Sequence, residues 1–223
     1  MIAQASSFFR DIDCAILFTE KLLYEVYMHL TEVIDRNIIT VIDLETTGLD
    51  CTQDYIIEVG AVKIGGWHKV NGKDGQALID KGNIIGQYSS LVSCPVKLSE
   101  KIVQLTGISD SVLNSAPAIN IVLKNLKEFV GDSIIVGHNI EFDCGFLHAH
   151  GSRYNIDFTN RKLDTITIAK TIFRDKVQSY SLSALTKMFG IRYMPHCALN
   201  DALATAQLFL ELAQRDDEAH CRY

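Results

Sequence analysis

The chain has 223 residues, 48% of them hydrophobic, so it is long enough to bury the core of one globular domain. It has three prolines and no Pro-, Gly- or Ser-rich segment, which excludes a long linker or a largely disordered chain. A net charge of −6 is not typical of a general nucleic-acid-binding protein. The six cysteines are scattered, without a CxxC pair or a Cys/His zinc spacing. No targeting signal is visible, so we expect free thiols and a cytoplasmic location.

The N-terminal segment is apolar but interrupted by charge. Acidic and basic side chains break the stretch from Ile12 to Leu30, which argues against a membrane-spanning helix or a signal-peptide core. Apolar residues recur at roughly helical spacing, which predicts an amphipathic helix over residues 6–35. We expect this helix to pack on the domain or on a partner, and we assign residues 1–36 to an N-terminal extension.

Strands are predicted first in the remaining chain. Residues 37–43 are almost continuously apolar and rich in Ile and Val, which is typical of a central strand buried on both faces. Residues 56–64 predict a second strand. Gly-Gly, Asn-Gly and Asp-Gly steps between Gly65 and Tyr88 predict a β-ribbon or extended loop, followed by a third strand near residues 87–92.

Helical patterns dominate the second half of the chain, and Gly107, Gly131 and Gly190 mark three of the expected helix ends. Strands that come early, with helices interleaved and accumulating later, predict an α/β layer fold with a mixed central sheet. We assign residues 37–215 to this domain and residues 216–223 to a short C-terminal tail. The predicted helices are 99–105, 118–130, 141–150, 164–173, 181–189 and 197–214, with a further buried strand at 133–136.

Asp43 and Glu45 form the first candidate site, where the first predicted strand emerges into a Thr-Thr-Gly turn. Carboxylates at i and i+2 of an extended chain point to the same face. They repel each other unless a proton or a cation separates them, and hard divalent cations prefer such oxygen ligands. The alternative is that both are solvent-exposed acids in a turn.

A second group follows the strand at 133–136, in the sequence His138-Asn139-Ile140-Glu141-Phe142-Asp143. Asn139 suits a helix N-cap, and acids in a first helical turn are favoured by the helix dipole. Taken alone, this group is explained by capping more simply than by catalysis.

The third group is His196-Cys197-Ala198-Leu199-Asn200-Asp201. Asp201 lies on a predicted helix whose other face is apolar, and His196 precedes that helix in a loop. An acid near a helix N-terminus and a loop histidine are each common without a function. The pattern gains meaning only together with the other two groups.

A local excess of basic residues lies just upstream of His196. Seven basic residues stand against two acidic ones between Arg161 and Arg192, in a chain that is acidic overall. Solvated helix faces explain such a run, and a flank that follows the phosphates of a nucleic acid is the functional alternative. The basic residues are Arg161, Lys162, Lys170, Arg174, Lys176, Lys187 and Arg192.

The order D-x-E-T-T-G, H-N-x-x-F-D and H-x-x-x-x-D resembles the DEDDh 3′→5′ exonucleases, and within them the DNA polymerase III epsilon (DnaQ-like) and PolC-type exonuclease domains. The resemblance extends from Ile38 to Leu212 and includes the segments 105–108 and 180–185. It implies a ribonuclease H-like fold, with a five-stranded mixed sheet flanked by helices. The N-terminal helix and the β-ribbon insertion would be additions to that fold.

The resemblance also implies a mechanism. Asp43, Glu45, Asp143 and Asp201 would hold two Mg²⁺ or Mn²⁺ ions, which clamp the attacking and leaving oxygens of an in-line displacement. His196 would be the general base, because a histidine with an ordinary pKa of about 6.5 can accept a proton at neutral pH. The products would be nucleoside 5′-monophosphates.

The implied substrate is a DNA 3′ end, single-stranded or frayed, held largely by its sugar–phosphate shape. The resemblance assigns the terminal nucleotide to Thr46, Thr47, Gly48, Leu49, Thr106 and Gly107, with Asn139 positioning the strand. A DNA polymerase subunit is a candidate partner, in proofreading or repair, and the N-terminal helix is the candidate contact.

Two other functions stay open. An RNA-directed relative, such as an oligoribonuclease or an RNase T-like trimming enzyme, would have the same catalytic residues. A binding or interaction module that has lost catalysis would keep the fold, although all five catalytic positions are intact here.

Overall fold

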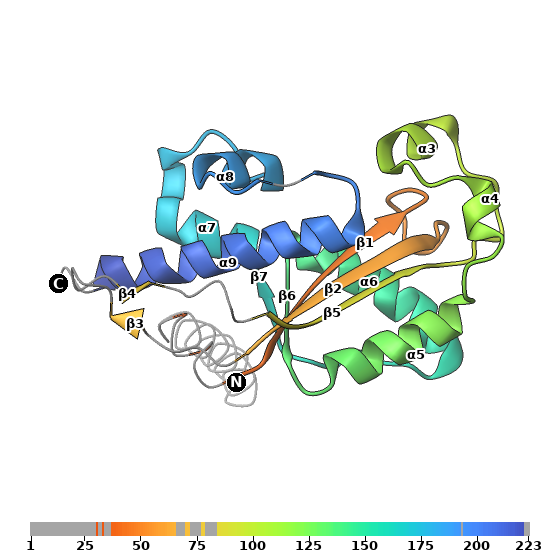
Figure 1. Cartoon of the computed structure of the whole chain (residues 1–223), viewed down its shortest axis with the longest axis horizontal. Coiled ribbons are helices and arrows are strands. Elements are labelled where there is room, and N and C mark those ends of the chain that lie inside the picture. The colour runs from red at the N-terminus through yellow and green to blue at the C-terminus, as the bar shows by residue number, and fades with distance from the viewer. Residues whose placement is uncertain are drawn as a thin grey trace, which may run out of the picture.

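The central feature of the molecule is a sheet of five strands, seen in a computed structural model of the chain (Figure 1). The described residues are Leu30, Val33, 37–65, 70–71, 77–78, 84–192 and 194–220. The strand order is β5 (Ile84–Leu91), β2 (Ile56–Ile64), β1 (Ile39–Thr46), β6 (Ile134–Gly137) and β7 (Lys162–Asp164). Strand β2 runs in the direction opposite to the other four strands, so the sheet is mixed, as predicted.

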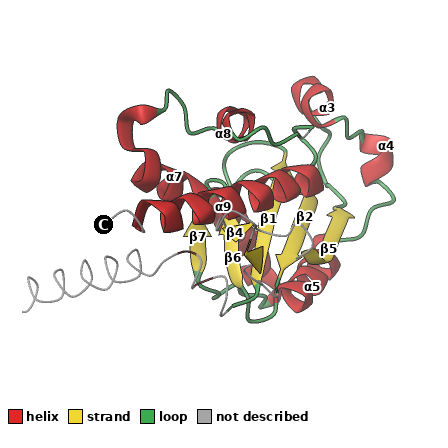
Figure 2. Cartoon of the chain, turned by 60° about the vertical axis from the view of Figure 1, so that its left-hand side comes forward, coloured by secondary structure: helices red, strands yellow, loops and turns green. Residues whose placement is uncertain are grey.

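Helices cover both faces of this sheet. The long helix α9 (Ala198–His220) lies across one face, where Ala202, Ala206 and Phe209 pack on the buried side chains of β1 and β2 (Figures 1 and 2). On the other face, α5 (Ile119–Val130) and α6 (Ile140–Gly151) pack against the alternate residues of the same strands. The central strand β1 is therefore buried on both faces, which its continuous apolar sequence predicts.

Two further pairs of helices complete the domain. Helices α3 (Glu100–Thr106) and α4 (Asp110–Leu113) follow β5, and a small apolar cluster joins them to Ile57. Helices α7 (Thr165–Phe173) and α8 (Leu182–Met188) pack on α9. In Figure 1, α3 lies beyond the C-terminal end of β1, and α8 lies above α9. Single 3₁₀ turns follow α6 and α7, at Ser152–Tyr154 and Arg174–Lys176.

Most predicted elements are found within one to three residues of their expected ends. Strand β7 and helix α4 were not predicted, because three- and four-residue elements carry no measurable periodicity. Helix α9 continues to His220, beyond the predicted end at residue 214 and through part of the segment expected to be a tail. The charged sequence after Leu212 contains neither Gly nor Pro to stop a helix.

The two predicted additions are described only in part. Val70–Asn71 (β3) and Ala77–Leu78 (β4) pair antiparallel, which confirms a β-ribbon between β2 and β5. Most of the helix predicted over residues 6–35 lies outside the described residues. Leu30 and Val33 have helical backbone; Val33 is buried beside α9, and the Leu30 amide donates to Asp216. No helix in the described part of the chain has the length and apolarity needed to cross a membrane.

Candidate active site

Two carboxylates project from the end of β1 onto the face that α9 covers. Asp43 and Glu45 continue the series of every second residue of β1 that begins with Ile39 and Val41, so they lie on the same face. Ile39 and Val41 belong to the core beneath α9. Across the antiparallel pair, Asp43 lies opposite Gly60 and Glu45 lies opposite Glu58. The pairing register shifts directly after Glu45, as at a β-bulge, and bulges are common beside active sites.

The start of α9 brings a third carboxylate and the histidine to the same place. Asp201 lies in the first turn and its Oδ2 accepts a hydrogen bond of 2.9 Å from the backbone amide of His196. His196 is exposed and has a left-handed backbone (φ 68°), which is uncommon for a residue other than glycine. Ligand atoms of Glu45, His196 and Asp201 all lie within 4.8 Å of one another.

Asp143 comes from the opposite layer. It lies in the first turn of α6, which follows β6 directly, and it is only 4% exposed. Because β1 and β6 are parallel neighbours, their C-terminal ends meet at one edge of the sheet. The structure therefore brings together all five residues assigned to catalysis from three separate segments of sequence. Their catalytic and metal-binding roles stay predictions.

Burial and mutual repulsion raise the pKa values of this carboxylate group. Burial is the largest cause of the rise at Asp43, and the charges of Asp143, Asp201, Glu45 and Glu58 add to it. The pKa of Glu45 is raised to about 7 by burial, then by Asp201 and Glu58. Burial also raises the pKa values of Asp143 and Asp201, although backbone hydrogen bonds oppose the rise. A cation removes the same repulsion that a proton removes.

The loop after β1 contains four residues predicted to hold the terminal nucleotide. Thr46 is buried and its hydroxyl donates to the carbonyl of Gly48, while Leu49 is 86% exposed. The Asp54 carboxylate accepts hydrogen bonds from the Thr47 hydroxyl and the Asp50 amide. A Cβ at Gly48 would lie 2.4 Å from that carboxylate, so a larger residue would displace the Asp54 side chain and its hydrogen bonds. The loop is thus rigid, with one large apolar side chain exposed.

Thr106 and Gly107 end helix α3. The Thr106 hydroxyl donates to the carbonyl of Ile102 and accepts from the amide of Ile108. Gly107 has a left-handed backbone (φ 73°), the usual conformation of a helix C-cap glycine, and open space surrounds the position of a Cβ. The structure thus gives both residues a local folding role; their part in substrate binding stays a prediction.

Asn139 precedes α6 in a left-handed conformation (φ 72°). It occupies the N-cap position, as expected from the sequence, but its side chain makes no capping hydrogen bond. Its backbone amide instead donates to Asp164, whose carboxylate also caps α7 through the amide of Ile166. The Asn139 side chain is exposed, and its role in positioning a substrate stays a prediction.

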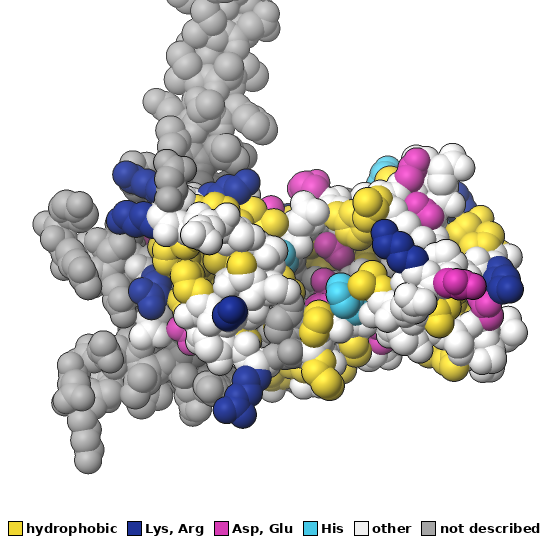
Figure 3. All heavy atoms as spheres, turned by 90° about the horizontal axis from the view of Figure 1, so that it is seen from above, with side chains coloured by type: hydrophobic (Ala, Val, Ile, Leu, Met, Phe, Trp, Pro, Cys, Tyr) yellow, Lys and Arg dark blue, Asp and Glu magenta, His cyan; other side chains and the backbone are white. Residues whose placement is uncertain are grey.

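Figure 3 shows several acidic side chains and a histidine close together near the middle of the face that it draws, while most Lys and Arg side chains lie farther out. The seven basic residues of the stretch 161–192 are all exposed. Lys162 lies 3.9 Å from Glu141, and Lys170 lies over the ring of Tyr180. These contacts agree with solvated helix faces, and a role in following phosphates stays a hypothesis.

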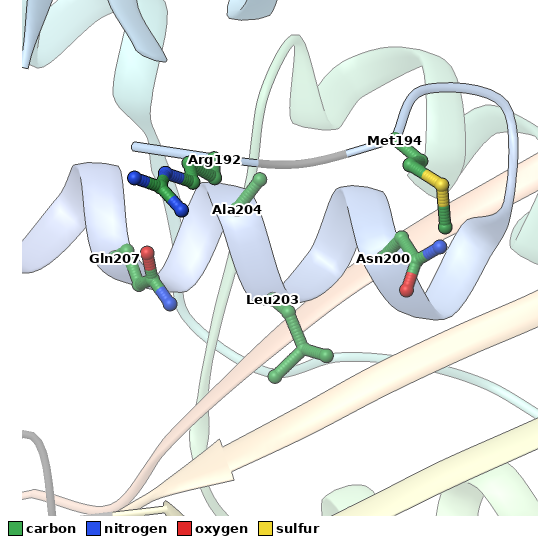
Figure 4. Close-up of a pocket in the computed structure, with 6 residues that line it drawn as sticks. All are labelled: Arg192, Met194, Asn200, Leu203, Ala204 and Gln207. Atoms are coloured by element: carbon green, nitrogen blue, oxygen red, sulfur yellow. The ribbon is translucent and has the colours of Figure 1, made fainter. Parts of the chain in front are cut away.

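A separate pocket of about 390 Å³ lies beside α9 (Figure 4). Met194 and Asn200 border one end of it, and Arg192 and Gln207 border the other. The residues that line it include none of the four carboxylates, so it is distinct from the candidate active site. Leu203 and Ala204 complete the lining.

Sequence reasoning missed three acidic residues that shape the site: Glu58, Asp54 and Asp164. Asp54 and Asp164 hold the two loops, and Glu58 lies opposite Glu45. Glu58 had a visible signal, because it is the one acid within the mostly apolar strand 56–64. Nothing local distinguishes Asp54 and Asp164 from ordinary turn and capping residues.

A buried carboxylate cluster at a sheet edge, with a histidine on an adjoining loop, defines a metal-dependent phosphodiesterase type of site. The chain belongs to the exonuclease family (RNase T type), whose family model matches residues 40–209. This membership confirms the resemblance found in the sequence. The family is dependent on divalent metal ions.

Relatives in sequence are PolC-type DNA polymerases III. The chain is 36% identical over 176 residues to that of Thermotoga maritima and 37% identical over 180 residues to that of Staphylococcus haemolyticus. These alignments cover 78% and 80% of this chain but only 12% and 11% of the polymerases. The chain therefore corresponds to one segment of those much longer proteins.

Solved structures confirm the ribonuclease H-like fold. Exonuclease X, in complex with 5′ overhanging duplex DNA, matches with a TM-score of 0.57 and 22% identity, over 78% of this chain and 90% of that one. Exonuclease I of E. coli, in complex with a dT13 oligonucleotide, matches with a TM-score of 0.65 and 17% identity, over 84% and 43%. At these identities the match concerns the fold.

The raised carboxyl pKa values predict how stability depends on pH. Without divalent ions, the folded state keeps protons that the unfolded chain releases above about pH 4. The free energy of unfolding should therefore decrease as pH rises toward the pKa of about 7 at Glu45. Thermal unfolding in EDTA should show a melting temperature that falls between pH 5 and pH 8. Mg²⁺ should restore it most at the upper end.

Asp43→Asn and Asp143→Asn are the controls for this profile. Each removes one ionisable group of the cluster, so each should flatten the decrease in EDTA. A wild-type melting temperature that rises across this range would contradict the raised pKa values.

Proposed function

We propose that this protein is a 3′→5′ exonuclease that removes nucleoside 5′-monophosphates from DNA 3′ ends, with two divalent ions as cofactors. The observation that carries the proposal is the convergence of Asp43, Glu45, Asp143 and Asp201 at one sheet edge, beside an exposed histidine. Membership of the exonuclease family supports the reaction class. Relatives that are DNA polymerases support DNA as the substrate.

The cluster fits metal ions on its own chemistry. Asp201 Oδ1 is buried and has no hydrogen-bond partner among the described residues, whereas Oδ2 accepts from His196. A buried carboxylate oxygen without a donor is costly, and a hard cation would satisfy it. The four carboxylates would hold two Mg²⁺ or Mn²⁺ ions, which would stabilise the attacking and leaving oxygens of an in-line displacement.

His196 would act as the general base. Its exposed position beside Glu45 and Asp201 lets it accept a proton from a water molecule that attacks the phosphorus. The new bond joins the water oxygen to phosphorus, and the bond between phosphorus and the 3′ oxygen breaks. The freed 3′ oxygen takes up a proton, and the product is a nucleoside 5′-monophosphate.

The terminal nucleotide would lie between the loop after β1 and the end of α3. Leu49 would contact its apolar parts, Gly48 and Gly107 would let the backbone approach closely, and Thr46, Thr47 and Thr106 would support these two segments. Asn139 would position the strand from the turn before α6. Little of this contact involves base edges, so the specificity would concern the 3′ end and its sugar.

The cellular role that we propose is proofreading beside a DNA polymerase, or repair, in the cytoplasm. The alignment with one segment of PolC-type polymerases supports a polymerase as partner. The N-terminal extension, residues 1–36, is the candidate for that contact. The cytoplasmic location stays a prediction.

Replacing a carboxylate of the cluster should abolish hydrolysis. Asp43→Ala removes the residue that all other acids of the cluster surround, so degradation of a 3′-labelled DNA oligonucleotide in Mg²⁺ should fall to background. Circular dichroism should show an unchanged fold. Glu128→Ala, an exposed acid on α5, is the matched control and should keep wild-type activity. Near wild-type degradation by the Asp43 variant would refute its assignment.

His196→Ala should lower kcat by about two to four decades, as expected for loss of a general base. The exposed side chain makes no hydrogen bond that supports the fold, judging from the described contacts, so stability should change little. Single-turnover kinetics with saturating Mg²⁺ measures the effect. A loss below fivefold would show that His196 is not the base.

A panel of 3′ ends tests the substrate class. Matched DNA and RNA oligonucleotides with single-stranded, paired and mismatched 3′ ends are digested in Mg²⁺, in Mn²⁺ and in EDTA. We expect DNA to exceed RNA, single-stranded and mismatched ends to exceed paired ends, and EDTA to stop the reaction. Faster digestion of RNA would assign the protein to the RNA-directed exonucleases.

A further inference from the structure

The N-terminus of α9 has no capping oxygen of its own. The first amides of a helix lack intrahelical partners, and a Ser, Thr, Asp or Asn before the helix usually supplies one. Cys197 occupies that position, since its carbonyl accepts the first helical hydrogen bond from the Asp201 amide. A thiol is a weak acceptor and a poor substitute for an oxygen.

A carboxylate from the neighbouring sheet provides the oxygen instead. Glu58 Oε2 accepts a hydrogen bond of 3.0 Å from the backbone amide of Ala198, the first residue of α9. Glu58 Oε1 lies 4.0 Å from the Cys197 Sγ. A negative charge at a helix N-terminus also interacts favourably with the helix dipole.

Gly60 fixes the distance between this helix end and the sheet. A Cβ at Gly60 would lie 2.2 Å from the Ala198 carbonyl carbon and 2.3 Å from the Leu199 amide nitrogen. Backbone therefore packs directly on backbone, and any larger residue would displace the helix. Glu58 and Gly60 are i and i+2 on β2, so they meet α9 from the same face of the strand.

The contacts of Glu58 and Gly60 with α9 connect the two parts of the candidate active site, the carboxylates of β1 and the residues at the start of α9. Glu58 lies opposite Glu45 in the strand pair, and Gly60 lies opposite Asp43. On the other side, the Asp201 carboxylate holds the amide of His196. The helix end, the histidine loop and the carboxylates of β1 are thus connected through one short segment of β2.

We propose that Glu58 is a positioning residue of the exonuclease: its hydrogen bond to Ala198 holds the start of α9, and with it His196 and Asp201, in register with Asp43 and Glu45. The inference rests on the proposed function for its kinetic consequence. The role belongs to the acceptor oxygen of Glu58, and its negative charge is secondary.

Three substitutions separate the hydrogen bond from the charge. Glu58→Ala loses both, Glu58→Gln keeps an acceptor oxygen without the charge, and Glu58→Asp keeps the charge on a side chain one methylene too short. With saturating Mg²⁺, we expect kcat of the Ala and Asp variants to fall about 10- to 100-fold, as for a small misplacement of catalytic groups. The Gln variant should stay within about threefold of wild type, and KM should change less than kcat.

Amide hydrogen exchange gives a measurement that needs neither substrate nor metal. In the full chain, observed by NMR in EDTA, Ala198 should be protected in the wild type and the Gln variant. Its exchange should accelerate about 10- to 100-fold in the Ala and Asp variants, the range for loss of a hydrogen bond to a charged group. Glu128→Ala is the control for removal of an acid elsewhere and should change neither exchange at Ala198 nor kcat.

The outcomes distinguish the two proposals. An Ala variant with wild-type kcat and protection, or an Asp variant that is active while the Gln variant is not, would overturn the role of the hydrogen bond. If the Ala variant does not fold, the Gln and Asp variants still decide. A wild type inactive on all DNA and RNA ends would overturn the proposed function, while exchange at Ala198 would still test the contact.

Discussion

The repulsion among buried carboxylates is the constraint on which this structure depends. Asp43 lies among four other acids, and burial raises the pKa values of the group by disfavouring charge. Such a cluster destabilises an ion-free fold at neutral pH and cannot assemble by its own attraction. It must be held by a scaffold whose other contacts are strong enough to oppose the repulsion.

The scaffold has this strength because the four carboxylates are attached to three different buried elements. Asp43 and Glu45 lie on the central strand, which is buried on both faces. Asp143 and Asp201 begin helices that pack on opposite faces of the sheet. Hydrophobic burial on each face fixes these elements independently, so the acids meet although they repel one another.

How much of this arrangement the sequence predicts depends on the range of each interaction. Alternation along β1 places Asp43 and Glu45 on one face, and this needs only local geometry. Convergence with Asp143 and Asp201 was inferred from the family resemblance, since no spacing rule relates residues on separate elements. The short strand β7 and helix α4 were missed because they owe their conformation to neighbours. Asn139 was expected to cap α6, yet Asp164 from a later segment holds its amide.

Glu58 is also a residue whose partner cannot be predicted from the sequence. Its charge within an apolar strand is visible in the sequence, but its partner, the Ala198 amide, is 140 positions away. The sequence around Cys197 likewise shows a helix start without an oxygen side chain. Only the folded structure shows that the Glu58 carboxylate supplies the oxygen that this helix start lacks. An acid that is not assigned as a metal ligand can thus still hold the helix that carries one of the site's carboxylates. Glu58 joins the helix that supplies Asp201 to the strand pair that supplies Asp43 and Glu45, so the support for these mutually repelling acids comes from the strand paired with β1.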